Sequence, residues 1–169
     1  MIIYVIFYPD CGWEKLDCTS YYVNTEKKNN KDAKADCIRM GGKLVEPTNA
    51  KHNAFVTQLA EKKGLYRFWI GIHDRKENDN EGNFVYESNN KDIIWKNWLY
   101  GRPTGYKYNK CHGGHCAEGL CPKGNWHDQC CTQSNAYVCE RMVYSGKYFL
   151  QPYNTVRNAW WEMSMNALQ

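Results

Sequence analysis

The cysteines limit the folds open to this chain more than any other feature of its sequence. The chain has nine cysteines in 169 residues, and six of them lie between residues 111 and 139. A chain of this length can bury about 70% of the surface that its unfolded form exposes, so it does not need disulfides to compensate for a small core. Cysteines that are far apart in sequence are typical of disulfides in extracellular proteins. We therefore expect a disulfide-stapled, secreted, extracellular protein.

Zinc binding is the alternative interpretation of the same cysteines. The segment 111–116, Cys-His-Gly-Gly-His-Cys, is followed by Cys121 and contains ligand types that zinc prefers. Its spacing matches no common zinc template, and the adjacent Cys130 and Cys131 cannot easily both join one tetrahedral site. The spacing favours disulfides, and because nine is an odd number, pairing within the chain leaves one cysteine over.

Composition and charge exclude several classes of protein. Hydrophobic residues make up 43% of the chain and aromatic residues 15%, which is too much for a disordered protein. The net charge of +4 is small, and no run of Lys or Arg is long enough for a nucleic-acid-binding arm. No apolar run approaches the roughly 20 residues that a membrane span needs. The sequence also contains no evident catalytic triad or activated cysteine, so we expect no enzyme.

Two helices are indicated by their capping residues and apolar spacing. The first is expected over about 31–40, with Asn29 or Asn30 as its N-cap and Gly41-Gly42 at its end. The second is expected over about 49–63, with Thr48 as its N-cap and Gly64 after its last turn.

Strands are expected on both sides of this helical region. Segments 66–72, 84–86 and 136–139 are rich in aromatic and branched residues. Segment 2–8 also suits a buried strand, although it could be the remnant of a signal peptide. Segment 97–124 has no periodicity and is expected to be a long irregular loop, which in a compact domain is usually functional or disordered. This order predicts an α+β fold with a mostly antiparallel sheet.

A set of landmarks between residues 11 and 140 resembles a C-type lectin-like domain of the long form. The landmarks, in order, are Cys11-Gly12-Trp13 with Cys18; Ala33, Cys37, Gly41-Gly42 and Leu44; Trp69-Ile70-Gly71-Ile72; Glu81-Gly82, Phe84 and Tyr86; Trp95, Trp98, Gly101 and Pro103; Cys116-Ala117-Glu118; Trp126, Asp128 and Cys131; and Cys139-Glu140. The resemblance implies two helices packed on small antiparallel sheets. It implies three parts: an N-terminal strand or signal remnant at 1–10, the lectin-like domain at 11–141, and a C-terminal extension at 142–169 for oligomerisation or self-packing.

The resemblance also implies a disulfide pattern. Three bridges are expected from it, namely Cys37–Cys139, Cys116–Cys131 and Cys11–Cys18. Cys121 and Cys130 flank Trp126, so a local bridge between them is expected, with Cys111 free or bonded to a second chain. Pairing of Cys111 with either of these two remains open, because sequence alone does not determine connectivity.

The family's sugar-bridging calcium site is largely missing from this sequence. The resemblance implies a Glu-Pro-Asn or Gln-Pro-Asp triplet, a further Glu, and an Asn-Asp pair as ligands, but here the triplet is Arg102-Pro103-Thr104 and His127 replaces the Asn. The further Glu is replaced by Gly114, so only Asp128 remains. Calcium takes six to eight oxygen ligands, and a guanidinium repels it. Calcium at this site is therefore doubtful, with Asp128 and Glu118 as the residues left to hold it.

Other residues of this region have expected roles outside the sugar-bridging site. Asp74 and Glu81 resemble an auxiliary calcium set, which an insertion separates here. Pro103 is expected to be a cis proline, as in the family. Four tryptophans, Trp69, Trp95, Trp98 and Trp126, are expected to be core residues rather than ligand platforms.

The predicted function is that of a carbohydrate-binding lectin whose loop, about 97–128, binds a glycan or glycoprotein without the calcium bridge. The loop is basic, with Arg102, Lys107, Lys110 and Lys123, and tyrosines lie among these cations, which favours anionic sugars. The expected ligand-binding residues are Arg102, Thr104, Tyr106, Tyr108, Glu118, His127 and Asp128. Homo-oligomerisation is the expected source of multivalency, with an interchain disulfide through Cys111 as one route. The alternative is a lectin-like protein-binding or structural subunit of an extracellular assembly.

Overall fold

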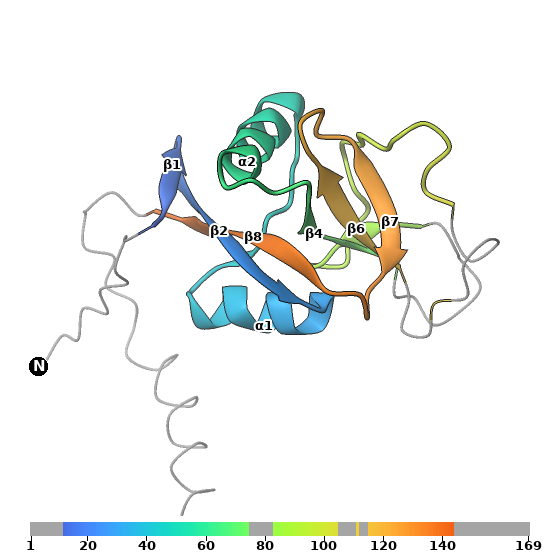
Figure 1. Cartoon of the computed structure of the whole chain (residues 1–169), viewed down its shortest axis with the longest axis horizontal. Helices are drawn as coiled ribbons and strands as arrows, with labels where there is room; N and C mark the ends of the chain where they lie inside the picture. Colours follow the sequence, from blue (N-terminus) through green and yellow to red (C-terminus); the bar gives the residue numbers. More distant parts are fainter. Residues whose placement is uncertain (1–11, 75–82, 105–110, 112–114, 144–169) are drawn as a thin grey trace, which may run out of the picture.

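The fold is built from two helices and eight short strands in the parts of the chain that the computed structural model describes, residues 12–74, 83–104, 111 and 115–143 (Figure 1). Their order and bounds are β1 (Glu14–Leu16), β2 (Thr19–Lys28), α1 (Asn30–Arg39), β3 (Lys43–Leu44), α2 (Ala50–Lys62), β4 (Arg67–His73), β5 (Val85–Tyr86), β6 (His115–Leu120), β7 (Trp126–Cys130) and β8 (Asn135–Met142). Neither helix among these residues is long and apolar enough to cross a membrane. The expected α+β fold is confirmed.

The strands form one mixed sheet in the order β1-β2-β8-β4-β6-β7, with β3 beside β8 and β5 beside β4. All pairings are antiparallel except that of β4 with β8. The long β2–β8 pair joins the beginning of the domain to its end, with Thr19 opposite Met142. The mostly antiparallel sheet agrees with the sequence-based prediction.

The two helices lie on opposite sides of the β2–β8 pair, α1 below it and α2 above it in Figure 1. Helix α1 is capped by Asn29, whose side chain accepts a hydrogen bond from the Asp32 N–H, and its buried face contains Ala33 and Cys37. The Cys37–Cys139 disulfide ties this face to β8, as the family resemblance implied. One side of the sheet is therefore held to its helix by a covalent bond as well as by packing.

Helix α2 begins one residue later than expected. Its N-cap is Asn49, whose side chain accepts a hydrogen bond of 2.9 Å from the His52 N–H, so the prediction of Thr48 was wrong. Both residue types are good caps, but only Asn49 has the position from which its oxygen reaches the third N–H of the first turn. The helix buries Val56, Leu59 and Ala60 against the sheet.

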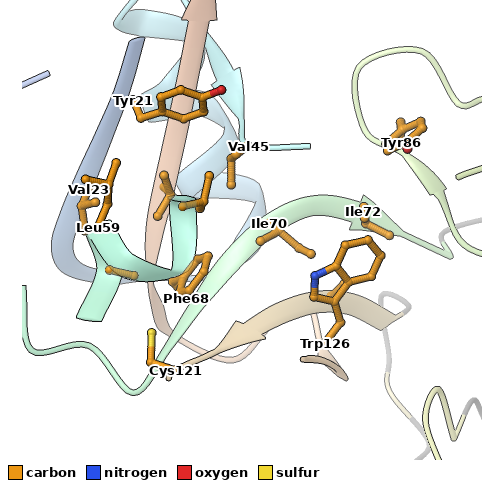
Figure 2. Packing of buried hydrophobic residues seen from close by; sticks show 14 of the residues in the cluster. Tyr21, Val23, Val45, Leu59, Phe68, Ile70, Ile72, Tyr86, Cys121 and Trp126 are labelled. Carbon is orange, nitrogen blue, oxygen red and sulfur yellow. The ribbon is translucent and has the colours of Figure 1, made fainter. Parts of the chain in front are cut away.

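The larger core lies between α2 and the sheet and extends toward β7 (Figure 2). Ile70 and Ile72 of β4 point toward the indole of Trp126, and Phe68 lies nearer to α2. Gly119 on β6 allows this packing, because a Cβ there would lie 2.6 Å from the Phe68 ring. Trp69 and Trp126 are fully buried, which confirms the expectation that they belong to the core, whereas Trp95 and Trp98 pack against the core and are only partly buried.

Five of the strands were missed by the sequence-based prediction, since the short β1 and β3 were not expected either. Strand β2 was not expected at all, and β6 and β7 lie in or directly after the segment 97–124 that was taken as irregular. These strands contain many polar residues, so they lack the apolar pattern on which the other strands were recognised. The strand expected at 2–8 lies outside the described residues, as does most of the extension at 142–169.

Candidate functional site

The visible part of the long loop runs along the free edge of β7. The Trp126 N–H donates to the Asn97 carbonyl at 2.7 Å, and the Leu99 N–H donates to the Trp126 carbonyl at 2.8 Å. A turn follows, closed by the Arg102 N–H donating to the Leu99 carbonyl at 2.9 Å. The Arg102–Pro103 peptide bond after it is cis, as expected. These contacts bring the segment 97–104 to Asp128, two residues further along β7.

Asp128 is the centre of the site, and both of its carboxylate oxygens are occupied by donors from the loop. Arg102 Nη1 lies 3.0 Å from Oδ1, while the backbone N–H and the hydroxyl of Thr104 each donate to Oδ2 at 2.9 Å. Arg102 Nη1 also lies 3.0 Å from the Thr104 hydroxyl oxygen. The Asp128 side chain is only 1% exposed, whereas that of Arg102 is 29% exposed. Three predicted site residues, Arg102, Thr104 and Asp128, are thus brought together.

The charge of Asp128 is stabilised by these contacts. Burial alone would raise the pKa of its carboxyl group, but the hydrogen bonds from Thr104 and Arg102 outweigh burial and hold the pKa below its usual value. Asp128 is therefore ionised at neutral pH, and its negative charge is balanced by the Arg102 guanidinium rather than by a bound cation.

This arrangement does not fit calcium. A calcium ion at Asp128 would have to displace a guanidinium and two Thr104 donors, and it would meet no second carboxylate at Arg102 or Thr104. Nowhere in the described parts of the chain do three or more His, Cys, Asp or Glu side chains gather in a way that could hold a metal ion. The segment around Gly114, which holds the last position of the family's ligand set, lies outside those parts.

Glu118, expected as a ligand-binding or calcium-binding residue, is instead fully buried on β6. Its carboxylate accepts hydrogen bonds from Arg67 at 3.2 Å and from Asn135 at 2.7 Å. A side chain without exposed surface cannot contact a ligand in this conformation, so its assignment to the binding surface was wrong. Burial raises the pKa of Glu118, although Arg67 and Asn135 oppose the shift. Sequence reasoning missed Arg67 and Asn135, since neither lies in a family motif or in the loop.

His127 lies beside this buried carboxylate. Its Nδ1 is 3.1 Å from Glu118 Oε1, and its side chain is 19% exposed. Burial and the nearby charge of Arg102 lower the pKa of the imidazole, so His127 is neutral at neutral pH. His127 therefore adds no positive charge to the loop, in contrast to Arg102.

Among the described residues of the loop, the most exposed aromatic side chain is that of Tyr100, at the tip of the turn that precedes Arg102. Its relative exposure is 102%, and the preceding Leu99 is 38% exposed. Tyr106 and Tyr108, the other tyrosines expected to contact ligand, lie outside the described residues, as do Lys107 and Lys110. Within the described loop, an exposed aromatic ring and a guanidinium are therefore presented two residues apart.

The cysteines of the loop are paired differently from the expected scheme. Cys111 is bonded to Cys130, so the prediction of a Cys121–Cys130 bridge and a free or interchain Cys111 was wrong. Cys116 is bonded to Cys131, as the resemblance implied. Cys121 instead carries a free thiol in the core (Figure 2). Its sulfur lies 3.6 Å from the carbonyl oxygen of Thr57 on α2.

Two sequence expectations lie partly or wholly outside the described residues. Cys11 lies outside the described residues, so its pairing with Cys18 stays a prediction. Glu81, one member of the expected auxiliary calcium pair, also lies outside the described residues. Asp74, the other member, is buried, and its carboxylate accepts a hydrogen bond of 2.7 Å from the His115 N–H. The Asp74 carboxylate thus joins β4 to β6.

A cavity among the described residues lies away from the loop. It measures about 660 Å³ and is bounded by the β1–β2 hairpin, residues 41–43, the first turn of α2 and the end of β8. Its buried carboxylates are already paired: Glu140 lies 3.2 Å from His52 and 3.4 Å from Lys43, and Glu46 binds Lys43 and Ser88. These charges compensate one another and give no sign of an absent ligand.

Comparisons with known proteins agree with this fold. The family model for the lectin C-type domain matches residues 26–141. A perlucin-like protein of Mytilus galloprovincialis is 30% identical over 131 residues, which are 76% of this chain and 80% of that protein. Collectin-10 of Xenopus tropicalis is 32% identical over 132 residues, but the match spans only 44% of its length.

A solved structure supports the same assignment. It is the C-type carbohydrate-recognition domain of cow CD23, determined in the presence of a GlcNAc2Man3 oligosaccharide, which is 26% identical with a TM-score of 0.63. The comparison covers 79% of this chain and 95% of that domain. The landmarks in the sequence, the mixed sheet with its two helices and these matches lead to one conclusion, that the chain belongs to the C-type lectin domain family.

Proposed function

We propose that this protein is a secreted carbohydrate-binding lectin that binds glycans at the loop face around Tyr100 and Arg102 without a calcium bridge. The observation that carries the proposal is the saturation of Asp128 by Arg102 and Thr104. In calcium-dependent relatives a cation joins protein and sugar, whereas here a guanidinium lies against the remaining carboxylate. A sugar at this surface would then contact protein groups directly.

The exposed groups of this face suit a glycan. Tyr100 offers a fully exposed ring for stacking on a sugar, and the partly exposed Arg102 has donors beyond the one that binds Asp128. Arg67 of β4, 43% exposed, adds a second guanidinium, which lies 3.2 Å from Glu118 of β6. Guanidinium groups bind carboxylate and sulfate in paired geometry, which favours anionic sugars. Support for sugar binding itself comes from the family and from the oligosaccharide used with the CD23 domain.

A glycan array probed with calcium and again with EDTA tests the proposal. We expect the same glycans to bind in both conditions, with sulfated or carboxylated sugars among them. Tyr100→Ala should weaken binding about fivefold, because stacking of a sugar ring on an exposed aromatic side chain is worth about 1 kcal/mol. Arg102→Ala should weaken binding of anionic sugars most, whereas Lys31→Ala, an exposed cation on α1, serves as the control and should change nothing.

Two results would count against the proposal. Binding that disappears in EDTA would show that a cation is needed, and an array with no positive glycan would favour the second candidate, a lectin-like protein-binding subunit. The exposed Ile94 and Leu99, 79% and 38% exposed, are the observation that favours this candidate, because apolar side chains at one loop suit a protein partner. Sedimentation at several concentrations would show whether the chain forms the homo-oligomer that we propose for multivalency. The Cys111–Cys130 disulfide argues against a covalent link between chains through Cys111.

A further inference from the structure

A second hollow lies beside the loop face, between α2 and the turn that joins β6 to β7. It measures about 260 Å³. Its lining residues are Ala50, Asn53, Ala54, Thr57, Gln58, Trp95, Asn97, Pro122 and Lys123. We call it the α2 groove. Figure 1 shows this turn next to α2.

The floor of the α2 groove is rigidly built. Asn53 is 7% exposed; its Nδ2 donates to the Gly124 carbonyl at 2.9 Å, and its Oδ1 accepts from the Trp126 indole N–H at 2.8 Å. Asn97 Nδ2 donates to the same Gly124 carbonyl at 2.8 Å. A Cβ on Gly124 would lie 2.6 Å from Asn53 Nδ2, so glycine is needed for this approach. The groove is thus formed before any ligand binds.

The chemistry of the α2 groove is that of a neutral, hydroxyl-rich ligand. Among the described residues that line it there is no carboxylate, and Lys123, which is exposed, is the only charged one. Trp95 supplies an aromatic wall that is held edge-on to Trp126, with ring centroids 5.3 Å apart. Among the described residues, no hydrogen bond engages Asn97 Oδ1 or the Gln58 amide, so both can bind ligand hydroxyls. Pockets of this kind, an aromatic wall with a few polar groups, bind small organic ligands.

The α2 groove and the loop face are joined by one segment of the chain, residues 97–102. Asn97 is bonded to Trp126, and Arg102 to Asp128, so the segment from 97 to 102 follows the edge of β7 from one site to the other. Trp126 and Asp128 are two residues apart on one strand, a separation of about 7 Å. One extended ligand can therefore contact both places.

We infer that the α2 groove is a subsite for a neutral sugar residue, and that the ligand of this protein is an oligosaccharide that extends from the Arg102 face into the groove. The inference rests on the proposed function for the nature of the ligand, but the groove is a separate surface with its own contacts. Trp95 provides the stacking face, and Asn97 and Gln58 provide hydrogen bonds to sugar hydroxyls.

Nuclear magnetic resonance of the full isotope-labelled chain tests the inference, with cellobiose, N,N′-diacetylchitobiose and mannobiose as neutral probes. We expect at least one probe to shift the side-chain amide signals of Asn97 and Gln58 and the indole signal of Trp95. Gln58→Ala should lower the affinity for that probe about fivefold, which is the effect of losing one hydrogen bond. Gln133→Ala, a matched change at an exposed turn, and Lys123→Ala should leave the affinity for neutral probes unchanged.

The outcomes separate this inference from the proposed function. Shifts confined to Tyr100 and Thr104 would overturn the groove subsite and leave the loop-face proposal standing. Shifts at Asn97 and Gln58 without any at Tyr100 would support the groove subsite, and the loop face, which favours anionic sugars, is tested separately by the glycan array. If none of the three probes shifts the groove signals, or if Gln133→Ala weakens binding as much as Gln58→Ala, the inference fails.

Discussion

Replacement of Asp128 is the change from which the structure predicts the most. The Asp128 carboxylate is 1% exposed and accepts one hydrogen bond from Arg102 and two from Thr104. Asp128→Asn keeps the shape of the side chain but removes its charge. It also places an NH2 group against the donors of Arg102 and Thr104. We therefore expect the loop to lose its attachment to β7 and the domain to lose stability.

The magnitude follows from the burial of the partners. Removing one member of a fully buried ion pair costs about 3–5 kcal/mol. The Arg102 side chain is 29% exposed and can regain water when the carboxylate is gone, so part of this cost is recovered. We expect Asp128→Asn to lower the free energy of unfolding by about 2–4 kcal/mol.

Urea unfolding of the oxidised protein measures this loss as a lower midpoint at an unchanged m-value. Asp92→Asn, at an exposed position in the segment that leads into the loop, is the matched control and should lie within about 0.5 kcal/mol of the wild type. A loss below about 1 kcal/mol for Asp128→Asn would refute the view that Asp128 anchors the loop.

The same pair of proteins should differ in a pH-dependent way. The folded-state pKa of Asp128 lies below its ordinary 3.8, so its contribution to stability is fully present above that value and is lost as the pH falls through the folded pKa. The difference between wild type and Asp128→Asn should be constant from about pH 5 to 7 and shrink below about pH 4. A difference that stays constant down to pH 2 would contradict the assigned pKa direction.

Three further predictions concern the disulfides and the core. Changing both Cys111 and Cys130 to Ser should lower the free energy of unfolding by about 3 kcal/mol, because their bond closes a sequence separation of 19 residues. Urea unfolding measures the loss and peptide mapping checks the pairing. A disulfide map that the change leaves unaltered would contradict the pairing. Burial raises the pKa of Cys121 to about 11, so its thiol should resist Ellman's reagent at pH 8 in the native protein and react with it in urea. Rapid labelling of this thiol in the native protein would refute its burial. Gly119→Ala should cost about 1–3 kcal/mol in thermal unfolding, since the new methyl group meets the Phe68 ring, and a variant as stable as wild type would show that the ring moves freely aside.

Much of the fold could be recognised in the sequence because its signals are local. The caps and glycines around α1 and α2 lie within a few residues of the helices that they bound, and the error at Thr48 concerned one of two adjacent good caps. Strands β6 and β7 were missed because they carry His115, Glu118 and His127 in place of alternating apolar residues. Their strand character comes from hydrogen bonds to each other and to β4.

The candidate site was only partly accessible from the sequence. The absence of calcium ligands could be read directly from Arg102-Pro103-Thr104 and His127, because it depends on residue type alone. The burial of Glu118 and its hydrogen bonds with Arg67 and Asn135 could not be predicted, since these two residues are 51 and 17 positions away along the chain. Contacts over such separations depend on strand register, for which the sequence contained no local signal.

By itself, the sequence determined the family landmarks, the two helices, the Cys37–Cys139 and Cys116–Cys131 bridges implied by those landmarks, and the loss of the calcium ligand set. Only the tertiary structure decided among the three loop cysteines, with Cys111 bonded to Cys130 and Cys121 left as a core thiol. It also decided that Arg102 binds Asp128. The physical reason is the same in both cases: residue type sets which bonds a side chain can form, but the path of the chain sets which partner lies within reach.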